Sequence, residues 1–217
     1  MKRIVILGAG TGGTMMANKL ARGLPGDGWK ITVLDQDDVH VYQPGLLFLP
    51  FGMYRPGEIQ KPRKGLLDPR VDLRLAGIER VAPDEGKVYL RGGDKLSYDI
   101  LLVATGSRIV PEQTEGLTGP GWRDTAFDFY TLEGASALAD KLATFRGGRV
   151  VVNVVEMPIK CPVAPLELLF LTEAFFTQRG LRDKVEIAYV TPLEGAFTKP
   201  RASAAFGGML AERGIEV

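Results

Sequence analysis

The chain has 217 residues, of which 45% are hydrophobic and 24% charged, a composition typical of a globular protein of one or two domains. Its formal net charge of +1 gives no electrostatic basis for nucleic-acid binding. A single cysteine, Cys161, excludes a disulfide framework within the chain, and no apolar run reaches the length of a membrane span.

The first part of the chain predicts a strand, a helix and a second strand in succession. We expect an apolar strand over residues 3–7, a helix over residues 11–23 and a second strand over residues 30–34, followed by Asp35. This alternation is typical of the start of a parallel sheet. Residues 36–69 are rich in proline and predict a long irregular stretch that is either functional or contains short elements.

The rest of the chain predicts a second α/β alternation after a turn-rich boundary at residues 111–121. Parallel strands that stop after two or three would leave an unpaired edge, so we expect the chain to be part of a longer polypeptide. We divide it into two domains, residues 1–112 and residues 113–217. Strands are expected over residues 72–75, 77–81, 87–90, 95–98, 99–105, 149–155, 185–191 and 215–217, and helices over residues 131–145, 165–179 and 202–213.

A glycine-rich turn joins the first strand to the first helix. Its first glycine permits a tight turn, its second lets the main chain approach a pyrophosphate, and its third lets the helix pack close to the strand. The helix N-terminus adds free N–H groups and a positive dipole end. Asp35, with Gln36 beside it, stands where a carboxylate binds ribose hydroxyls and disfavours a 2′-phosphate. The turn has the GxGxxG spacing and reads Gly8-Ala9-Gly10-Thr11-Gly12-Gly13.

A second motif indicates which dinucleotide this is. Residues 98–106 read YDILLVATG and resemble the YDxLxxATG stretch of the two-dinucleotide-domain flavoproteins related to glutathione reductase. The resemblance implies tandem Rossmann-like domains with FAD at the first glycine motif, and the second domain incomplete here. It also implies that FAD is approached by Gln43, by Ile78 and by the strand end formed by Ala104, Thr105 and Gly106. His40, the only histidine, is either a proton relay near the flavin or a surface residue.

The second strand-to-helix turn, residues 156–165, contains no glycine. Prolines there lack N–H donors and Glu156 would repel a pyrophosphate, so we do not expect NADH to bind. Cys161 stands instead before a helix, where the helix N-terminus and the neighbouring Lys160 favour the nucleophilic thiolate. The alternative from the residues alone is that Cys161 is a small buried hydrophobic residue.

The segment CPVAPLE, residues 161–167, resembles the active-site segment of the sulfide:quinone oxidoreductases and the related flavocytochrome c sulfide dehydrogenases. The resemblance implies an enzyme that oxidises sulfide, or a related sulfur species, at a cysteine persulfide or disulfide and passes electrons through FAD to a quinone. Cys161 is then catalytic. From their positions near it, we expect Lys160 to assist as a positive neighbour and Glu167 either to act as an acid or base or to be a solvated partner of the helix dipole. This chain would be the N-terminal half, and the second cysteine and quinone pocket would lie in the other half. Tyr42, where some relatives have a cysteine, predicts non-covalent FAD.

Further expectations concern location and partners. We expect a cytoplasmic protein with peripheral contact at the inner face of the cell membrane, since no export signal is visible. No metal site is expected, and a homo-oligomer stays open. The sequence leaves two alternative functions open: an NADH:quinone oxidoreductase and a non-catalytic FAD-binding redox sensor.

Overall fold

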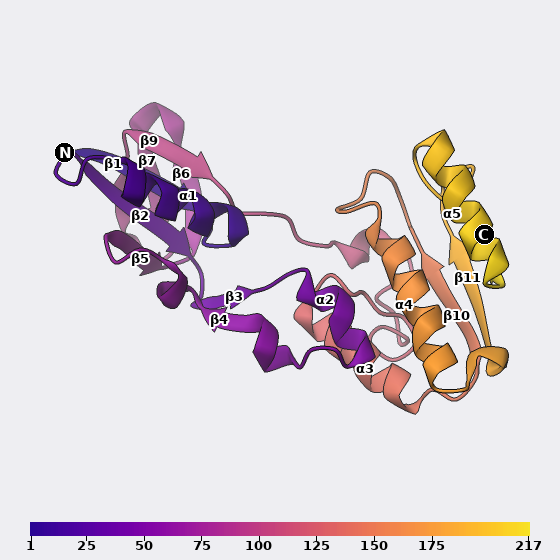
Figure 1. Ribbon diagram of the computed structural model, residues 1–217. Coiled ribbons are helices and arrows are strands. Elements are labelled where there is room, and N and C mark those ends of the chain that lie inside the picture. The colour runs from indigo at the N-terminus through magenta and orange to yellow at the C-terminus, as the bar shows by residue number, and fades with distance from the viewer. The chain divides into compact units, whose positions relative to one another are not determined.

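The computed structural model describes all 217 residues, which fall into two compact units (Figure 1). Unit 1 consists of Met1–Tyr42 and Gly57–Ile109, and unit 2 consists of Gln43–Pro56 and Val110–Val217. The division predicted from the sequence, at residues 112 and 113, placed Gln43–Pro56 in the first domain. In the structure this segment packs within unit 2.

Unit 1 is built on a four-stranded parallel sheet in the order β5-β2-β1-β9. Alternate residues of β1 are buried on opposite faces, as expected of a strand. Ile4 and Ile6 pack with Ala17 of helix α1, whereas Val5 and Leu7 belong to a separate cluster on the other face. The elements are β1 (Lys2–Leu7), α1 (Thr11–Gly23), β2 (Trp29–Asp35), β5 (Val71–Leu75) and β9 (Ile100–Val103).

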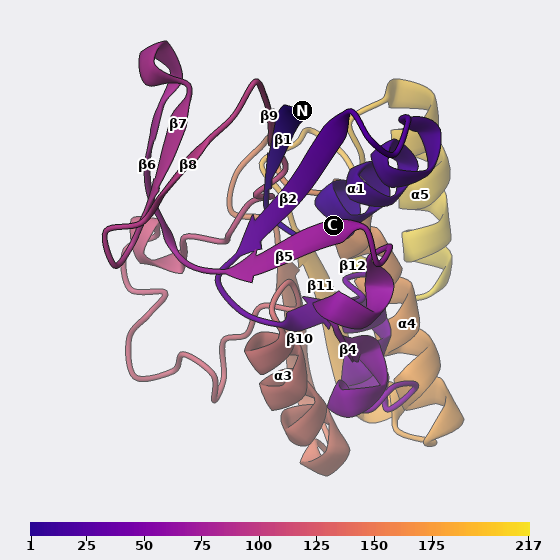
Figure 2. The same ribbon diagram turned by 90° about the vertical axis from the view of Figure 1, so that its left-hand side faces the viewer.

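An antiparallel sheet of three strands covers the face of the parallel sheet opposite α1. Val88 and Leu90 of β7 pack against Val5 and Leu7 of β1, which closes the second core of this unit. Figure 2 shows this small sheet on one side of β1 and β2 and helix α1 on the other. Its strands are β6 (Ile78–Ala82), β7 (Lys87–Leu90) and β8 (Lys95–Ser97), with a 3-10 turn at Pro83–Glu85.

The proline-rich stretch after Asp35 contains short elements, as the sequence allowed. Strands β3 (Val39–Val41) and β4 (Gln60–Pro62) pair antiparallel in unit 1, and the 3-10 turn Arg63–Leu66 follows directly. Between them, helix α2 (Gly45–Phe48) and the 3-10 turn Leu49–Phe51 belong to unit 2, followed by a 3-10 turn at Pro56–Ile59. Leu47 and Phe51 pack against the core of unit 2, and the Phe51 ring centroid lies 5.7 Å from that of Phe175. Apolar burial therefore decides which unit this segment joins.

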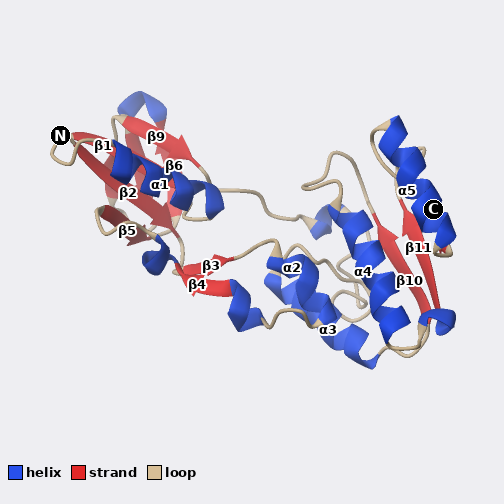
Figure 3. Cartoon of the chain, in the orientation of Figure 1, coloured by secondary structure: helices blue, strands red, loops and turns tan.

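Unit 2 contains a three-stranded parallel sheet in the order β10-β11-β12. Figure 3 shows β10 and β11 side by side, with helix α4 next to them. Leu166, Leu169 and Phe176 of α4 are fully buried against this sheet and its neighbours, which explains the apolar run that the sequence has there. The predicted tandem α/β class is confirmed. The elements are α3 (Leu132–Thr144), β10 (Gly148–Asn153), α4 (Ala164–Gln178), β11 (Val185–Val190), α5 (Pro200–Glu212) and β12 (Ile215–Glu216), with 3-10 turns at Pro111–Gln113 and Arg182–Lys184. None of the helices has the length and apolarity needed to cross a membrane.

Candidate active site

The glycine turn after β1 is held by close main-chain packing. Gly8 has φ +95°, a conformation that L side chains rarely adopt, and a Cβ atom there would overlap the carbonyl oxygen of Ala104. A Cβ on Gly13 would overlap the carbonyl oxygen of Gly8. The Ala104 N–H donates to the Leu7 carbonyl at 2.8 Å. The two predicted FAD motifs, the glycine turn and the Ala-Thr-Gly strand end, therefore lie side by side.

Gly10 differs from these two glycines because the space in front of it is open. A Cβ atom built on Gly10 meets no atom within 4 Å. Helix α1 begins at Thr11, no side chain caps it, and its first turn carries no acidic residue. Its terminal N–H groups are therefore left for an external acceptor. A diphosphate fits this arrangement of an open glycine and an uncapped helix N-terminus.

Asp35 lies beside this turn rather than pointing freely into solvent. Its Oδ2 accepts a hydrogen bond from the Ala9 N–H at 2.7 Å, and its Oδ1 accepts one from the Gln36 N–H at 2.8 Å. The guanidinium of Arg63 lies against the same carboxylate, with 3.3 Å between Nη1 and Oδ2. The sequence did not predict this contact of Arg63, because the residue lies in a stretch without a recognisable motif.

Other predicted FAD contacts lie in unit 1 as well. Thr105 and Gly106 are exposed just after β9, and Gly106 has a left-handed φ of +72°. Ile78 begins β6, where the strand register shifts between Ile78 and Arg80. Gln43 is the exception, because it belongs to unit 2.

Cys161 lies between β10 and α4 and is exposed. It has φ +58°, a left-handed conformation that is uncommon for a residue other than glycine. Its carbonyl accepts a hydrogen bond from the Ala164 N–H, the first residue of α4, at 3.1 Å. The exposure contradicts the alternative that Cys161 is a buried hydrophobic residue. Residues other than glycine with a left-handed backbone cluster at functional sites, because this strained conformation persists only where the surrounding structure holds it.

The two residues predicted to assist Cys161 lie differently around it. The Lys160 ammonium donates to Oε1 of Gln43 at 2.8 Å, a contact within unit 2 that the sequence did not predict. Glu167 is exposed in the first turn of α4, where a carboxylate interacts favourably with the helix dipole.

Tyr130 is the residue of this site that sequence reasoning missed. Its hydroxyl donates to the Lys160 carbonyl at 2.8 Å and lies 3.5 Å from that of Cys161. Burial, with smaller contributions from the nearby Cys161 and Glu167, raises the pKa of Tyr130 to about 12. Tyr130 therefore keeps its proton near neutral pH and acts as a hydrogen-bond donor. A lone tyrosine before a helix gives no sequence signal of this role.

Asp128 fixes the main chain on which Tyr130 stands. Its Oδ1 accepts hydrogen bonds from the N–H of Tyr130 at 3.0 Å, the N–H of Thr131 at 2.8 Å and the Thr131 hydroxyl at 2.9 Å. The Thr131 hydroxyl in turn caps α3 by accepting from the Gly134 N–H at 3.0 Å. Arg123 pairs with the other carboxylate oxygen of Asp128 at 3.0 Å. The tyrosine is thus held by a capped helix rather than by a free loop.

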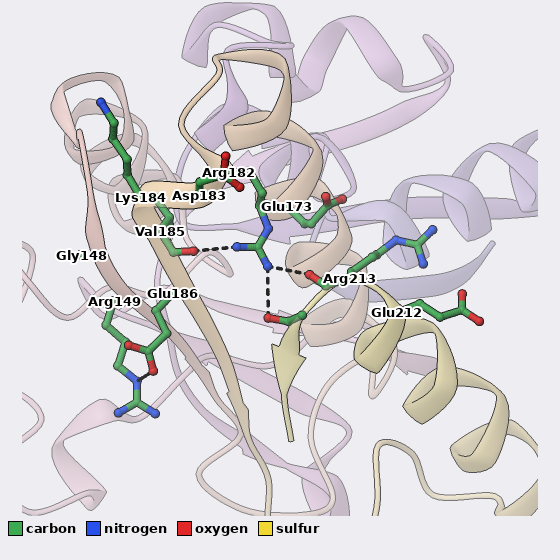
Figure 4. Close-up of a pocket in the computed structure, with 11 residues that line it drawn as sticks. Gly148, Arg149, Glu173, Arg182, Asp183, Lys184, Val185, Glu186, Glu212 and Arg213 are labelled. Atoms are coloured by element: carbon green, nitrogen blue, oxygen red, sulfur yellow. Dashed lines mark hydrogen bonds and ion pairs between the residues drawn. The ribbon is translucent and has the colours of Figure 1, made fainter.

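A pocket of about 790 Å³ lies elsewhere in unit 2 (Figure 4). Its lining includes Gly148 and Val185, the first residues of β10 and β11, so it lies at the end of the sheet away from Cys161. Arg182 fills part of it by donating to the carbonyls of Val185 at 2.7 Å and Arg213 at 2.6 Å. Ligands of open α/β sheets bind at the carboxyl ends of strands, so this pocket is not the candidate site.

Comparison with known proteins bears on this geometry. The sequence profile of the pyridine nucleotide-disulphide oxidoreductases matches residues 2–153. The chain belongs to this family. Members of the family use FAD, which confirms the cofactor predicted from the two motifs.

Individual relatives confirm the more specific resemblance. The chain is 24% identical to the mitochondrial sulfide:quinone oxidoreductase of Dictyostelium discoideum over 214 residues, which are 98% of this chain and 47% of that protein. The crystal structure of the sulfide:quinone oxidoreductase of Aquifex aeolicus superposes with a TM-score of 0.84 at 24% identity, covering 100% of this chain and 50% of that one. The alternative NAD(P)H-ubiquinone oxidoreductase C1 of Arabidopsis thaliana is 27% identical over 208 residues, covering 86% of this chain and 38% of that protein. The chain thus spans half or less of the length of each of these relatives.

Proposed function

We propose that this chain is the FAD-binding and cysteine-bearing part of an enzyme that oxidises sulfide, or a related sulfur species, and delivers the electrons to a quinone. The observation that carries the proposal is the exposed, left-handed Cys161 at the strand-to-helix turn where a nicotinamide enzyme would have its second glycine motif. Similarity to sulfide:quinone oxidoreductases over nearly the whole chain supports it. The proposed location is the cytoplasmic side of a membrane, where a quinone is available.

The proposed reaction at Cys161 forms one sulfur–sulfur bond. A Cys161 thiol and hydrogen sulfide together give a cysteine persulfide, two protons and two electrons. FAD, when bound, accepts an electron pair of this kind, and a quinone with two protons is the matching final acceptor. The role of this chain is to hold a reactive sulfur at an accessible turn and to bind the dinucleotide through Gly8, Gly10 and Gly13.

Neighbours of Cys161 have supporting roles in this proposal. Tyr130 positions the turn through the Lys160 carbonyl, and Lys160 itself is held by Gln43. Glu167 is placed to exchange protons with solvent beside the sulfur, because it is exposed on the first turn of α4. Gln43 thereby enters the cysteine site, in addition to the flavin contact that the resemblance implies.

A Cys161→Ser variant tests the proposal directly. It is expected to bind FAD like the wild type and to be reduced normally by dithionite, because Cys161 lies in unit 2 and the glycine turn lies in unit 1. Addition of sulfide should bleach the flavin absorbance of the wild type and leave that of the variant unchanged. Equal bleaching of both by sulfide would remove Cys161 from the reaction.

A second candidate is an NADH:quinone oxidoreductase, which the Arabidopsis relative favours. Against it stands the turn 156–165, which has no glycine and begins with an exposed Glu156. Stopped-flow reduction of the flavin by NADH and by sulfide, in parallel, separates the two functions. A flavin that neither reductant bleaches would favour the redox-sensor alternative instead.

A further inference from the structure

Arg63 is a largely buried cation at the glycine turn that neither the motifs nor the proposed reaction explains. Its side chain is only 11% exposed, although it follows the short strand β4 near the surface of unit 1. Burying a guanidinium is costly unless its N–H groups find acceptors. The acceptors of these N–H groups therefore indicate the role of Arg63.

The guanidinium bridges two parts of the chain that are far apart in sequence. Its Nε donates to the Asp37 carbonyl at 2.9 Å, and its Nη2 donates to Oδ1 of Asp37 at 3.2 Å. Its Nη1 donates to the carbonyl oxygen of Ala9 at 2.8 Å. The loop after β2 thus holds the planar group in place, and Nη1 is aimed at the glycine turn.

The Ala9 residue is consequently held at both of its polar groups. Its N–H is bound by Asp35, and its carbonyl accepts from Arg63 and from the Thr14 hydroxyl at 3.0 Å. The Ala9–Gly10 peptide is trans, as the only cis peptide in the chain is Met157–Pro158. In a trans peptide the C=O and the next N–H point in opposite directions. The Gly10 N–H therefore points away from Arg63.

Charge gives Arg63 a second effect at the same place. The Asp35 carboxylate is 14% exposed and hydrogen-bonded to the glycine turn, so its negative charge would repel a pyrophosphate arriving at Gly10. Nη1 of Arg63 lies 3.3 Å from Oδ2 of Asp35 and offsets this charge. The two opposite charges then largely cancel beside an anionic ligand.

We infer that Arg63 is a positioning residue for the dinucleotide, which orients the Ala9–Gly10 peptide so that the Gly10 N–H donates to the FAD pyrophosphate and which neutralises Asp35 beside it. The inference concerns FAD binding and rests on the proposed function only for the identity of the dinucleotide. It is independent of sulfide, quinone and Cys161.

The test compares Arg63→Met with Arg63→Lys and with a matched control, Arg70→Met. Arg70 is an arginine of the same unit whose side chain is 54% exposed and paired with Asp68 alone. FAD dissociation constants are measured by flavin fluorescence without sulfide or quinone. We expect Arg63→Met to weaken FAD binding about tenfold to a hundredfold, as for loss of a charge-assisted hydrogen bond. Arg63→Lys should be intermediate, because one ammonium cannot hold both Asp37 and Ala9, and Arg70→Met should match the wild type.

A second readout separates positioning from general support of the fold. ADP, which carries the pyrophosphate, is added to protein labelled with ¹⁵N-glycine, and the Gly10 amide resonance is followed. It should shift in the wild type and in Arg70→Met but not in Arg63→Met at the same ADP concentration. Two results would overturn the inference. One is that Arg63→Met binds FAD with an affinity within about twofold of that of the wild type. The other is that ADP does not shift the Gly10 amide resonance of the wild type. If Arg63→Met does not fold, Arg63→Lys decides, and full wild-type affinity there overturns it.

Discussion

The hydroxyl of Tyr130 donates a hydrogen bond to the carbonyl oxygen of Lys160 at 2.8 Å, and so a residue just before α3 holds the turn that carries Cys161. The bond joins residues 30 positions apart. It gives the exposed cysteine a fixed main chain although no strand or helix contains it. Mutations at Tyr130 should therefore affect Cys161 without touching its sulfur.

Replacement of Tyr130 by Phe should loosen the Cys161 turn. We expect a loss of about 1 kcal/mol in the free energy of unfolding, the usual net value of one hydrogen bond, and slower flavin reduction by sulfide. Urea denaturation and stopped-flow bleaching measure the two effects. Tyr89→Phe is the matched control, since it removes a hydroxyl bonded to Glu85 at 2.6 Å in unit 1. Slower bleaching in the control to the same degree would show that the effect is not specific to the turn.

The pKa of Tyr130 predicts how stability changes at high pH. Burial and the nearby Cys161 and Glu167 together raise this pKa to about 12, whereas a tyrosine of the unfolded chain titrates near 10.0. The folded protein thus binds the proton more tightly, so this contribution to stability is fully present below pH 10 and is lost as the pH rises toward 12. The difference in unfolding free energy between the wild type and Tyr130→Phe should therefore shrink across that window. A constant difference would contradict the raised pKa.

Two glycines of the same turn should respond oppositely to alanine. Gly10→Ala should leave the unfolding free energy within about 1 kcal/mol of the wild type, because the new methyl group meets no atom within 4 Å. The same methyl occupies the space of the pyrophosphate, so FAD binding should fall by more than about tenfold. Gly8→Ala should destabilise unit 1 by about 3 kcal/mol or more, since Gly8 has φ +95° and its Cβ would overlap the Ala104 carbonyl. Equal FAD affinity of Gly10→Ala and wild type would refute the assignment of this turn.

Substitutions of Lys160 and Gln43 separate two roles of the lysine. If the ammonium acts by anchoring the turn on Gln43, Lys160→Met and Gln43→Leu should change the alkylation rate of Cys161 by similar factors. If it acts by its charge on the thiolate, only Lys160→Met should slow alkylation. We expect the anchoring result, because the ammonium is 2.8 Å from the Gln43 oxygen. Iodoacetamide labelling over a pH series distinguishes the outcomes, with Lys184→Met as a control in the same unit.

Periodicity and spacing within the sequence determined the α/β class and the dinucleotide-binding glycine turn, and the resemblance of residues 98–106 to a flavoprotein motif indicated FAD. These features are local, because each strand pattern, helix pattern and glycine turn depends only on residues that are close together in the sequence. The replacement of the second glycine motif by Cys161 was readable for the same reason.

Contacts between distant segments were decided only by the tertiary structure. Arg63 reaches Ala9 across 54 positions, and Lys160 reaches Gln43 across 117. Such pairs depend on how buried apolar surfaces bring the segments together, as when Leu47 and Phe51 draw residues 43–56 into unit 2. No local pattern encodes that packing, because it is the sum of many weak contacts over the whole unit.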